Sequence, residues 1–109
     1  MAATFTAEPL EEPLGFWLRE LRLQASIAFA PYGQLFQALL DPASLLRTND
    51  RGLNVLLVQP DDLCGGETPR LAPIAQASEV LDRNVRDFLA ALSEAIAASS
   101  VPYVLCWCP

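Results

Sequence analysis

Residues 52–62 spell Gly-Leu-Asn-Val-Leu-Leu-Val-Gln-Pro-Asp-Asp, and this stretch decides the fold that we predict. Its centre, residues 53–58, is an almost unbroken apolar run with turn-forming residues on either side. A run of this length without alternation, rich in Val and Leu, is typical of a strand buried on both faces of a parallel sheet. Ligands bind beyond the carboxyl ends of such strands, which directs attention to the loop that carries Asp61 and Asp62.

Strand and helix patterns alternate along the rest of the chain. Further strands are predicted at residues 2–6, 25–29 and 103–108. Helices are predicted from Pro13 onward, at residues 34–40 and at residues 77–99, with a short helical piece at 43–46 that has Asp41 as N-cap and Pro42 at its first position. The intervening residues 61–73 are rich in Gly, Pro and polar side chains and are predicted to form a loop.

This alternation predicts right-handed crossovers and a parallel sheet between helices. We expect a three-layer, flavodoxin-like α/β unit with four strands in the order 2-1-3-4. The last predicted strand has no helix after it in the chain, which leaves one edge and part of one face bare. We therefore expect an incomplete unit, either a fragment of a larger domain or a unit that needs a neighbour.

Two helices carry clear apolar stripes. In the first, Leu14, Trp17, Leu18 and Leu21 fall at helical spacing, and Trp17 is predicted to lie in the core. In the last, the same spacing joins Val85, Phe88, Leu89, Leu92 and Ile96.

Charge and composition exclude several classes of function. The net charge is −6, with seven Arg, no Lys and no His, and an acidic surface repels the phosphates of nucleic acids. The lack of His removes the commonest general base and metal ligand. No apolar run reaches the roughly 18 residues of a membrane span, and no basic segment precedes an apolar one as in a signal peptide. We expect a cytoplasmic protein that binds neither nucleic acid nor membrane.

The three cysteines do not form a recognisable site. Cys64, Cys106 and Cys108 are odd in number, and they lack the further ligands that tetrahedral zinc needs, so we expect buried thiols and no metal. The Gly-Gly-Glu-Thr sequence at residues 65–68 has no Lys and no strand–loop–helix context, so it is not a phosphate-binding loop.

Several phrases together resemble a known family. They are Thr-Phe-Thr-Ala-Glu-Pro-Leu at 4–10, Phe-Trp-Leu-Arg-Glu-Leu at 16–21, Phe-Ala-Pro-Tyr-Gly-Gln-Leu-Phe-Gln at 29–37, Leu-Asp-Pro-Ala-Ser-Leu-Leu at 40–46, Asn-Val-Leu-Leu-Val at 54–58 and Cys-Trp-Cys-Pro at 106–109. These resemble the N-terminal lobe of FkbH-like domains, whose second half is a phosphatase domain of the HAD type (subfamily IIIC). Such domains occur alone or fused into nonribosomal peptide and polyketide synthases of secondary-metabolite biosynthesis.

The resemblance implies a lobe with an SGNH-hydrolase-like fold. For the complete FkbH-like protein it implies glyceryl transfer, in which a phosphorylated glycerate is dephosphorylated and its glyceryl group is loaded onto an acyl or peptidyl carrier protein. The residues of that chemistry, and the Mg²⁺ they imply, belong to an Asp-x-Asp motif in the HAD half. No Asp-x-Asp occurs in this chain, so no catalytic residue and no cofactor carries over. The implied partners are a HAD-type domain and a carrier protein.

Departures from the family and two alternatives stay open. After the central strand the family continues with an acidic residue, Asp and Trp, whereas this chain has Pro-Asp-Asp-Leu at 60–63. One alternative is a small SGNH-type hydrolase with Thr4 or Thr6 as nucleophile and Asp61 or Asp62 as loop carboxylate, although such a hydroxyl needs a base that is usually His. The other is a degenerate gene fragment, or a docking module of a synthase without activity. Under each interpretation, the exposed strand edge offers a template for self-association.

Overall fold

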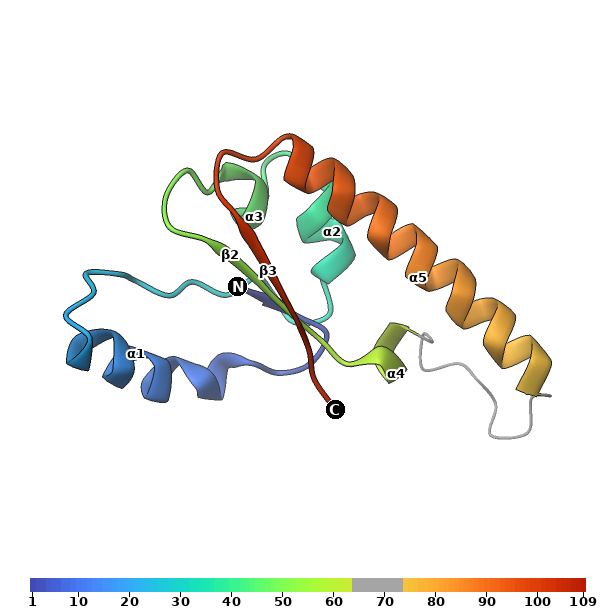
Figure 1. Ribbon diagram of the computed structural model, residues 1–109, viewed down its shortest axis with the longest axis horizontal. Helices are drawn as coiled ribbons and strands as arrows, with labels where there is room; N and C mark the ends of the chain where they lie inside the picture. Colours follow the sequence, from blue (N-terminus) through green and yellow to red (C-terminus); the bar gives the residue numbers. More distant parts are fainter. Residues whose placement is uncertain (64–73) are drawn as a thin grey trace.

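A three-stranded parallel sheet forms the centre of the computed structural model, which describes residues 1–63 and 74–109. Strand β2 (Asn54–Val58) lies between β1 (Ala2–Ala3) and β3 (Tyr103–Trp107), in the order β1-β2-β3 (Figure 1). Leu56 is the register partner of both Ala2 and Leu105. The central strand predicted from residues 53–58 is confirmed, as is the mixed α/β class with a parallel sheet.

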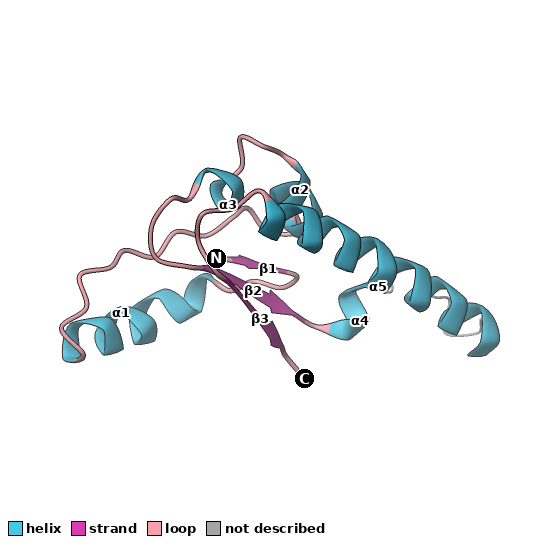
Figure 2. Ribbon diagram, turned by 45° about the horizontal axis from the view of Figure 1, so that its top comes forward, coloured by secondary structure: helices cyan, strands magenta, loops and turns pink. Residues whose placement is uncertain are grey.

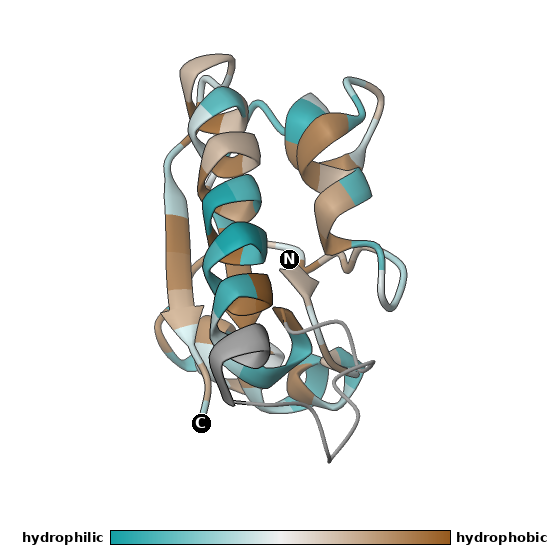
Figure 3. Cartoon of the chain, turned by 90° about the vertical axis from the view of Figure 1, so that its right-hand side faces the viewer, coloured by the Kyte–Doolittle hydropathy of each residue, from teal (hydrophilic) through white to brown (hydrophobic). Residues whose placement is uncertain are grey.

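One face of the sheet carries the main core. Helices α2 (Leu35–Leu40), α3 (Leu45–Thr48) and α5 (Ile74–Ala97) cover it. The largest fully buried side chains all lie in this layer and belong to Leu39, Leu46, Leu56, Val58 and Phe88. Figure 3 shows the hydrophilic, solvent-facing side of α5 in front and a hydrophobic stretch along β3 at the left.

Phe88 joins the elements of this core. Its ring makes edge-to-face contacts with Phe36 of α2 at 5.9 Å and with Trp107 of β3 at 6.4 Å between ring centroids. Aromatic pairs in this geometry add to the stabilisation that burial alone gives. A single side chain of α5 therefore holds a neighbouring helix and an edge strand together.

Among the described residues Asn54 is the buried polar residue, and both the nitrogen and the oxygen of its side-chain amide have hydrogen-bond partners. It donates to the carbonyl of Leu46 at 2.8 Å and accepts from the side chain of Asn49 at 3.0 Å. A buried amide without partners would be strongly destabilising, so these bonds are the reason that a polar residue is tolerated here. They fix the end of α3 against the start of β2.

The predicted strand at residues 25–29 is not formed as a strand. The segment nevertheless runs beside β1: the amino group of Met1 donates to the carbonyl of Ala28, and the N–H of Ala30 donates to Met1 at 2.7 Å. These two bonds, on either side of Phe29, have the pattern of a parallel pair. A turn from Pro31 to Gln34 bends the chain away after Ala30, so the pairing does not continue beyond that residue. Partial burial also lowers the pKa of the Met1 amino group.

Other predicted boundaries also need correction. Strand β1 ends at Ala3, and α5 begins three residues before the predicted start. Ser44, and not Asp41, is the N-cap of the short helix, because its Oγ accepts from the N–H of Arg47 at 3.2 Å. The start of the predicted loop forms a short helix, α4 (Pro60–Leu63), and residues 64–73 of that loop lie outside the described residues.

The other face of the sheet is poorly covered. Helix α1 (Glu11–Glu20) lies on the opposite side of the strands from α5, as Figures 1 and 2 show, but it contains no buried residue. Within residues 1–63 and 74–109, the buried cluster on this face is small and centres on Ala3, Ala7 and Leu57. Trp17 is 59% exposed, so the prediction that it lies in the core is wrong.

The incomplete packing shows in the dimensions of the molecule. Its radius of gyration is 15.5 Å, whereas a compact chain of this length is expected near 13 Å. Its accessible surface is 7674 Å², whereas a compact protein of 11.9 kDa exposes about 6,000 Å². The chain therefore presents roughly 1,700 Å² more surface than a compact domain of its mass.

Replacement of Phe88 by Ala tests the proposed core. Because Phe88 is fully buried, Phe88→Ala should lower the free energy of unfolding by about 3–5 kcal/mol in a chemical denaturation experiment. Leu89→Ala is the matched control, since Leu89 is the next residue of α5 and is 45% exposed; we expect a loss below about 1 kcal/mol. Similar losses for both variants would contradict this packing.

Candidate functional site

The carboxyl ends of β1 and β2 form the edge at which a ligand site was predicted. Here the Oγ1 of Thr4 accepts from the backbone N–H of Gln59 at 3.0 Å, and the Gln59 side chain donates to the carbonyl of Pro109 at 3.1 Å. The N–H of Cys108 donates to Val58 at 2.8 Å. These bonds tie the three strand ends to one another, so the Thr4 hydroxyl has a structural partner.

The candidate catalytic residues Thr6, Asp61 and Asp62 follow these strand ends and are all exposed. Thr6 lies in the turn after β1, and the two aspartates lie in the first turn of α4. Carboxylates at a helix N-terminus are stabilised by the helix dipole, which accounts for their position without a catalytic role. A hydroxyl nucleophile needs a base within hydrogen-bond reach, and no hydrogen bond between Thr6 and either aspartate is found.

Cys106 and Cys108 are half-buried and free, and they pack on the less covered face of the sheet. The Sγ of Cys108 lies 3.8 Å from the carbonyl of Cys106, so its thiol has a backbone partner. Among residues 1–63 and 74–109, no three His, Cys, Asp or Glu side chains gather as a metal site would require. Cys64 and the Gly-Gly-Glu-Thr sequence at 65–68 lie outside the described residues.

Helix α1 has well-defined ends although it is poorly packed. A 3₁₀ turn (Glu8–Leu10) leads into it, and Glu11 and Glu12 in its first turn suit the helix dipole. At its other end the N–H of Arg22 donates to Arg19, and the N–H of Leu23 donates to Leu18. This pair of bonds is the Schellman motif, and Arg22 occupies its left-handed position with φ 56°.

The exposed apolar residues of this segment are Phe16, Trp17, Leu21 and Leu23, which we call the α1 surface. The rings of Phe16 and Trp17 make an edge-to-face contact at 5.5 Å. Two adjacent aromatic residues on a helix without a buried residue expose a large apolar area, which is a mark of interaction sites. The spacing of Leu14, Trp17 and Leu21 in the sequence revealed an apolar stripe, but it did not show that the stripe is exposed.

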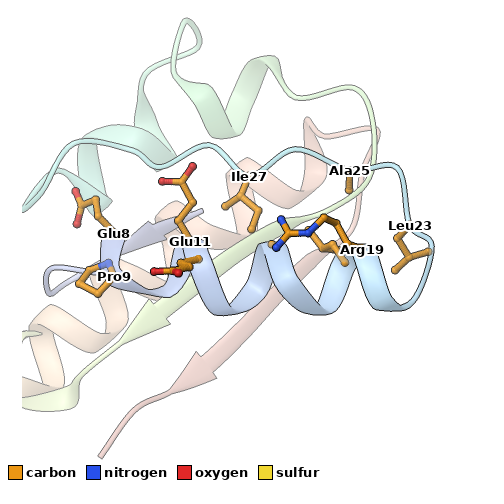
Figure 4. Close-up of a pocket in the computed structure, with 10 residues that line it drawn as sticks. Glu8, Pro9, Glu11, Arg19, Leu23, Ala25 and Ile27 are labelled. Atoms are coloured by element: carbon orange, nitrogen blue, oxygen red, sulfur yellow. The ribbon is translucent and has the colours of Figure 1, made fainter.

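An open groove of about 560 Å³ runs between α1 and the extended segment that follows it. Figure 4 shows glutamates at one end and Arg19 toward the other, with apolar residues of the extended segment along the side. The lining residues are Glu8, Pro9, Glu11, Glu12, Gly15, Leu18, Arg19, Leu23, Ala25 and Ile27. The groove separates α1 from the extended segment beside it. A helix packed tightly against its neighbours would leave no such gap.

Comparison of the chain with protein-family models, curated proteins and solved structures finds no significant match. Of the helices in the described parts of the chain, none has the length and apolar character needed to cross a membrane.

Substitution of Arg22 by Gly tests the end of α1. A non-glycine residue in the left-handed region is strained, so Arg22→Gly should stabilise the end of the helix by about 0.5–1 kcal/mol. Amide exchange of α1, measured by NMR, should slow by about two- to five-fold. Glu20→Gly, inside the same helix, should accelerate it. Faster exchange in Arg22→Gly would contradict the assigned motif.

Substitution of Thr4 tests whether its hydroxyl is structural. Thr4→Val keeps the shape of the side chain but removes the acceptor for the Gln59 N–H, so we expect a loss of about 1 kcal/mol in the free energy of unfolding. Thr6→Val should change it by less than about 0.5 kcal/mol, because Thr6 is exposed. Equal effects in urea denaturation would overturn this assignment.

Proposed function

We propose that the chain is a non-catalytic α/β interaction lobe that binds a HAD-type domain of an FkbH-like protein. In this role it supports transfer of a glyceryl group from a phosphorylated glycerate to a carrier protein, and the chemistry belongs to the HAD-type domain. The observation that carries the proposal is the α1 surface, an apolar and aromatic patch on a helix that contains no buried residue.

The composition of the α1 surface suits a binding partner. Aromatic residues are enriched where protein interfaces concentrate their binding energy, and Phe16 and Trp17 stand side by side here. Leu21 and Leu23 extend the patch at the end of the helix, where the Schellman motif holds Leu23 against the groove.

The order of the elements supports the finer fold that the proposal implies. The segment at residues 28–30 bonds to Met1 on the far side of β1 from β2, the position that the order 2-1-3-4 gives to the second strand. Helix α1 joins β1 to that segment and lies on the opposite side from α5 (Figure 2). We propose that α1 forms the outer layer of a three-layer, SGNH-like arrangement, on the side of the sheet opposite α5.

The carboxyl edge of the sheet favours a supporting role over a hydrolase. Acyl transfer by a hydroxyl needs a free, activated nucleophile. The Thr4 hydroxyl already accepts a hydrogen bond from the Gln59 N–H. In the described part of the chain, no hydrogen bond joins Thr6 to a side chain that could act as its general base. These contacts support a structural edge, so we do not propose a second function.

A binding experiment with a purified HAD-type domain tests the proposal. We expect co-elution of the two proteins in size-exclusion chromatography and a cooperative melt of the lobe that rises on mixing. Trp17→Ala should weaken the binding by at least about tenfold in isothermal titration calorimetry, because an aromatic residue at the centre of a patch is a typical hot spot.

Trp107→Ala is the matched control, since Trp107 is also a half-exposed tryptophan but lies in β3. This variant should keep the affinity of the unmodified chain. Absence of binding to HAD-type domains, or equal losses for both tryptophans, would contradict the proposed function. A carrier protein alone, added in place of the HAD-type domain, should not raise the melting temperature.

A further inference from the structure

Strand β3 lies at the edge of the sheet, and no described segment pairs with its outer side. Its partner on the inner side is β2, with which it is in register from Tyr103 to Trp107. An edge strand presents unpaired N–H and C=O groups that readily pair with another strand. The residues of β3 therefore decide whether this edge is protected or available.

The register shows which backbone groups point outward. In a parallel ladder the N–H and C=O of one residue point to the same side, and successive residues alternate. The carbonyl of Pro102 and the N–H of Cys108 bond to β2, so the backbone groups of Val104 and Cys106 also face β2. The N–H and C=O groups of Tyr103, Leu105 and Trp107 consequently point to the open edge.

Nothing in the composition of β3 protects this edge. Natural edge strands avoid unwanted pairing with charged residues, proline, bulges or very short length. Residues 103–107, Tyr-Val-Leu-Cys-Trp, contain no charge and no proline, and the strand is as long as the central one. Val104 is 43% exposed and Trp107 is 51% exposed, so apolar side chains accompany the free backbone groups.

We propose that β3 pairs antiparallel with β3 of a second copy of this chain, about a two-fold axis through Leu105. The outward-facing residues then form hydrogen-bonded pairs, Leu105 with Leu105 of the second copy and Tyr103 with Trp107. This register uses every outward backbone group of the strand. It also sets each Tyr opposite a Trp, and aromatic cross-strand pairs of this kind stabilise sheets.

The rest of the molecule is compatible with this pairing. A two-fold axis perpendicular to the sheet leaves α5 of both copies on the same face, side by side over a six-stranded sheet. Leu89 and Ile96 are seven residues apart on α5, share one stripe and are exposed within the single chain. Val104 lies opposite Cys106 in this register, and no like charges face each other along the strand.

The exposed surface of the chain is large enough for a dimer interface and for a second interface with a different partner. A standard interface removes about 800 Å² from each protein, whereas this chain exposes roughly 1,700 Å² more than a compact domain of its mass. The β3 edge and the α1 surface belong to different elements of the chain, so a second copy at β3 and a different partner at the α1 surface use different residues. The dimer is therefore independent of the proposed function.

Analytical ultracentrifugation of the whole chain tests the proposal. We expect a concentration-dependent species of about twice the chain mass of 11.9 kDa. Trp107→Glu replaces the indole ring in both aromatic pairs by a carboxylate and should weaken the dimer by at least about tenfold. Trp17→Glu, an equally exposed tryptophan on α1, should leave it unchanged. A monomer at all concentrations, or an equal effect of both variants, would overturn the proposal.

Disulfide trapping tests the register separately from stability. In a Cys64→Ser, Cys108→Ser background, Val104→Cys places the new thiol opposite Cys106 of the second copy, in a pair that is not hydrogen-bonded. The Cα atoms of such a pair are about 4.5 Å apart, which a disulfide spans. We expect a covalent dimer on a non-reducing gel. Its persistence after the further change Cys106→Ser would contradict this register.

Discussion

A parallel sheet must be covered on both faces, and this requirement governs the whole structure. Parallel strands carry apolar side chains on both sides, so water contact on either face is unfavourable. Helices α2, α3 and α5 cover one face and bury Leu56, Val58 and Phe88 among them. On the other face, helix α1 lies on the correct side without burying a residue. The exposed α1 surface and the open groove both follow from this incomplete layer.

The two exposed regions differ in the physical interaction they offer. The α1 surface offers aromatic and aliphatic side chains on a helix, the kind of patch that a partner buries by side-chain packing. The β3 edge offers unpaired backbone groups in a regular row, which only another strand satisfies in full. The two regions are different parts of one chain, and each contains one exposed tryptophan. Trp17 belongs to the α1 surface, and Trp107 belongs to the β3 edge.

The sequence predicted the features that depend on local pattern. The almost unbroken apolar run at residues 53–58 predicted the central strand, and the repeat through Phe88 and Leu92 predicted α5. It also predicted the parallel order of the three strands that form. The sequence did not predict the features that depend on contacts between distant parts of the chain. The spacing of Trp17 predicts an apolar stripe equally well whether the stripe is covered or exposed. Residues 25–29 have strand character, but their bonds to β1 are limited to those of Ala28 and Ala30 with Met1. The hydrogen bond between Thr4 and Gln59 joins residues 55 positions apart, so no local pattern reveals it.

Hydrogen–deuterium exchange of the chain, alone and with a HAD-type domain, tests the central claim most directly. Helices without buried side chains open easily, whereas core helices exchange only through global unfolding. In the free chain, the amides of α1 should exchange far faster than those of α5 around Phe88, and the added domain should protect α1. Protection of α1 equal to that of α5 in the free chain would mean that the second face is already covered, and it would contradict this account.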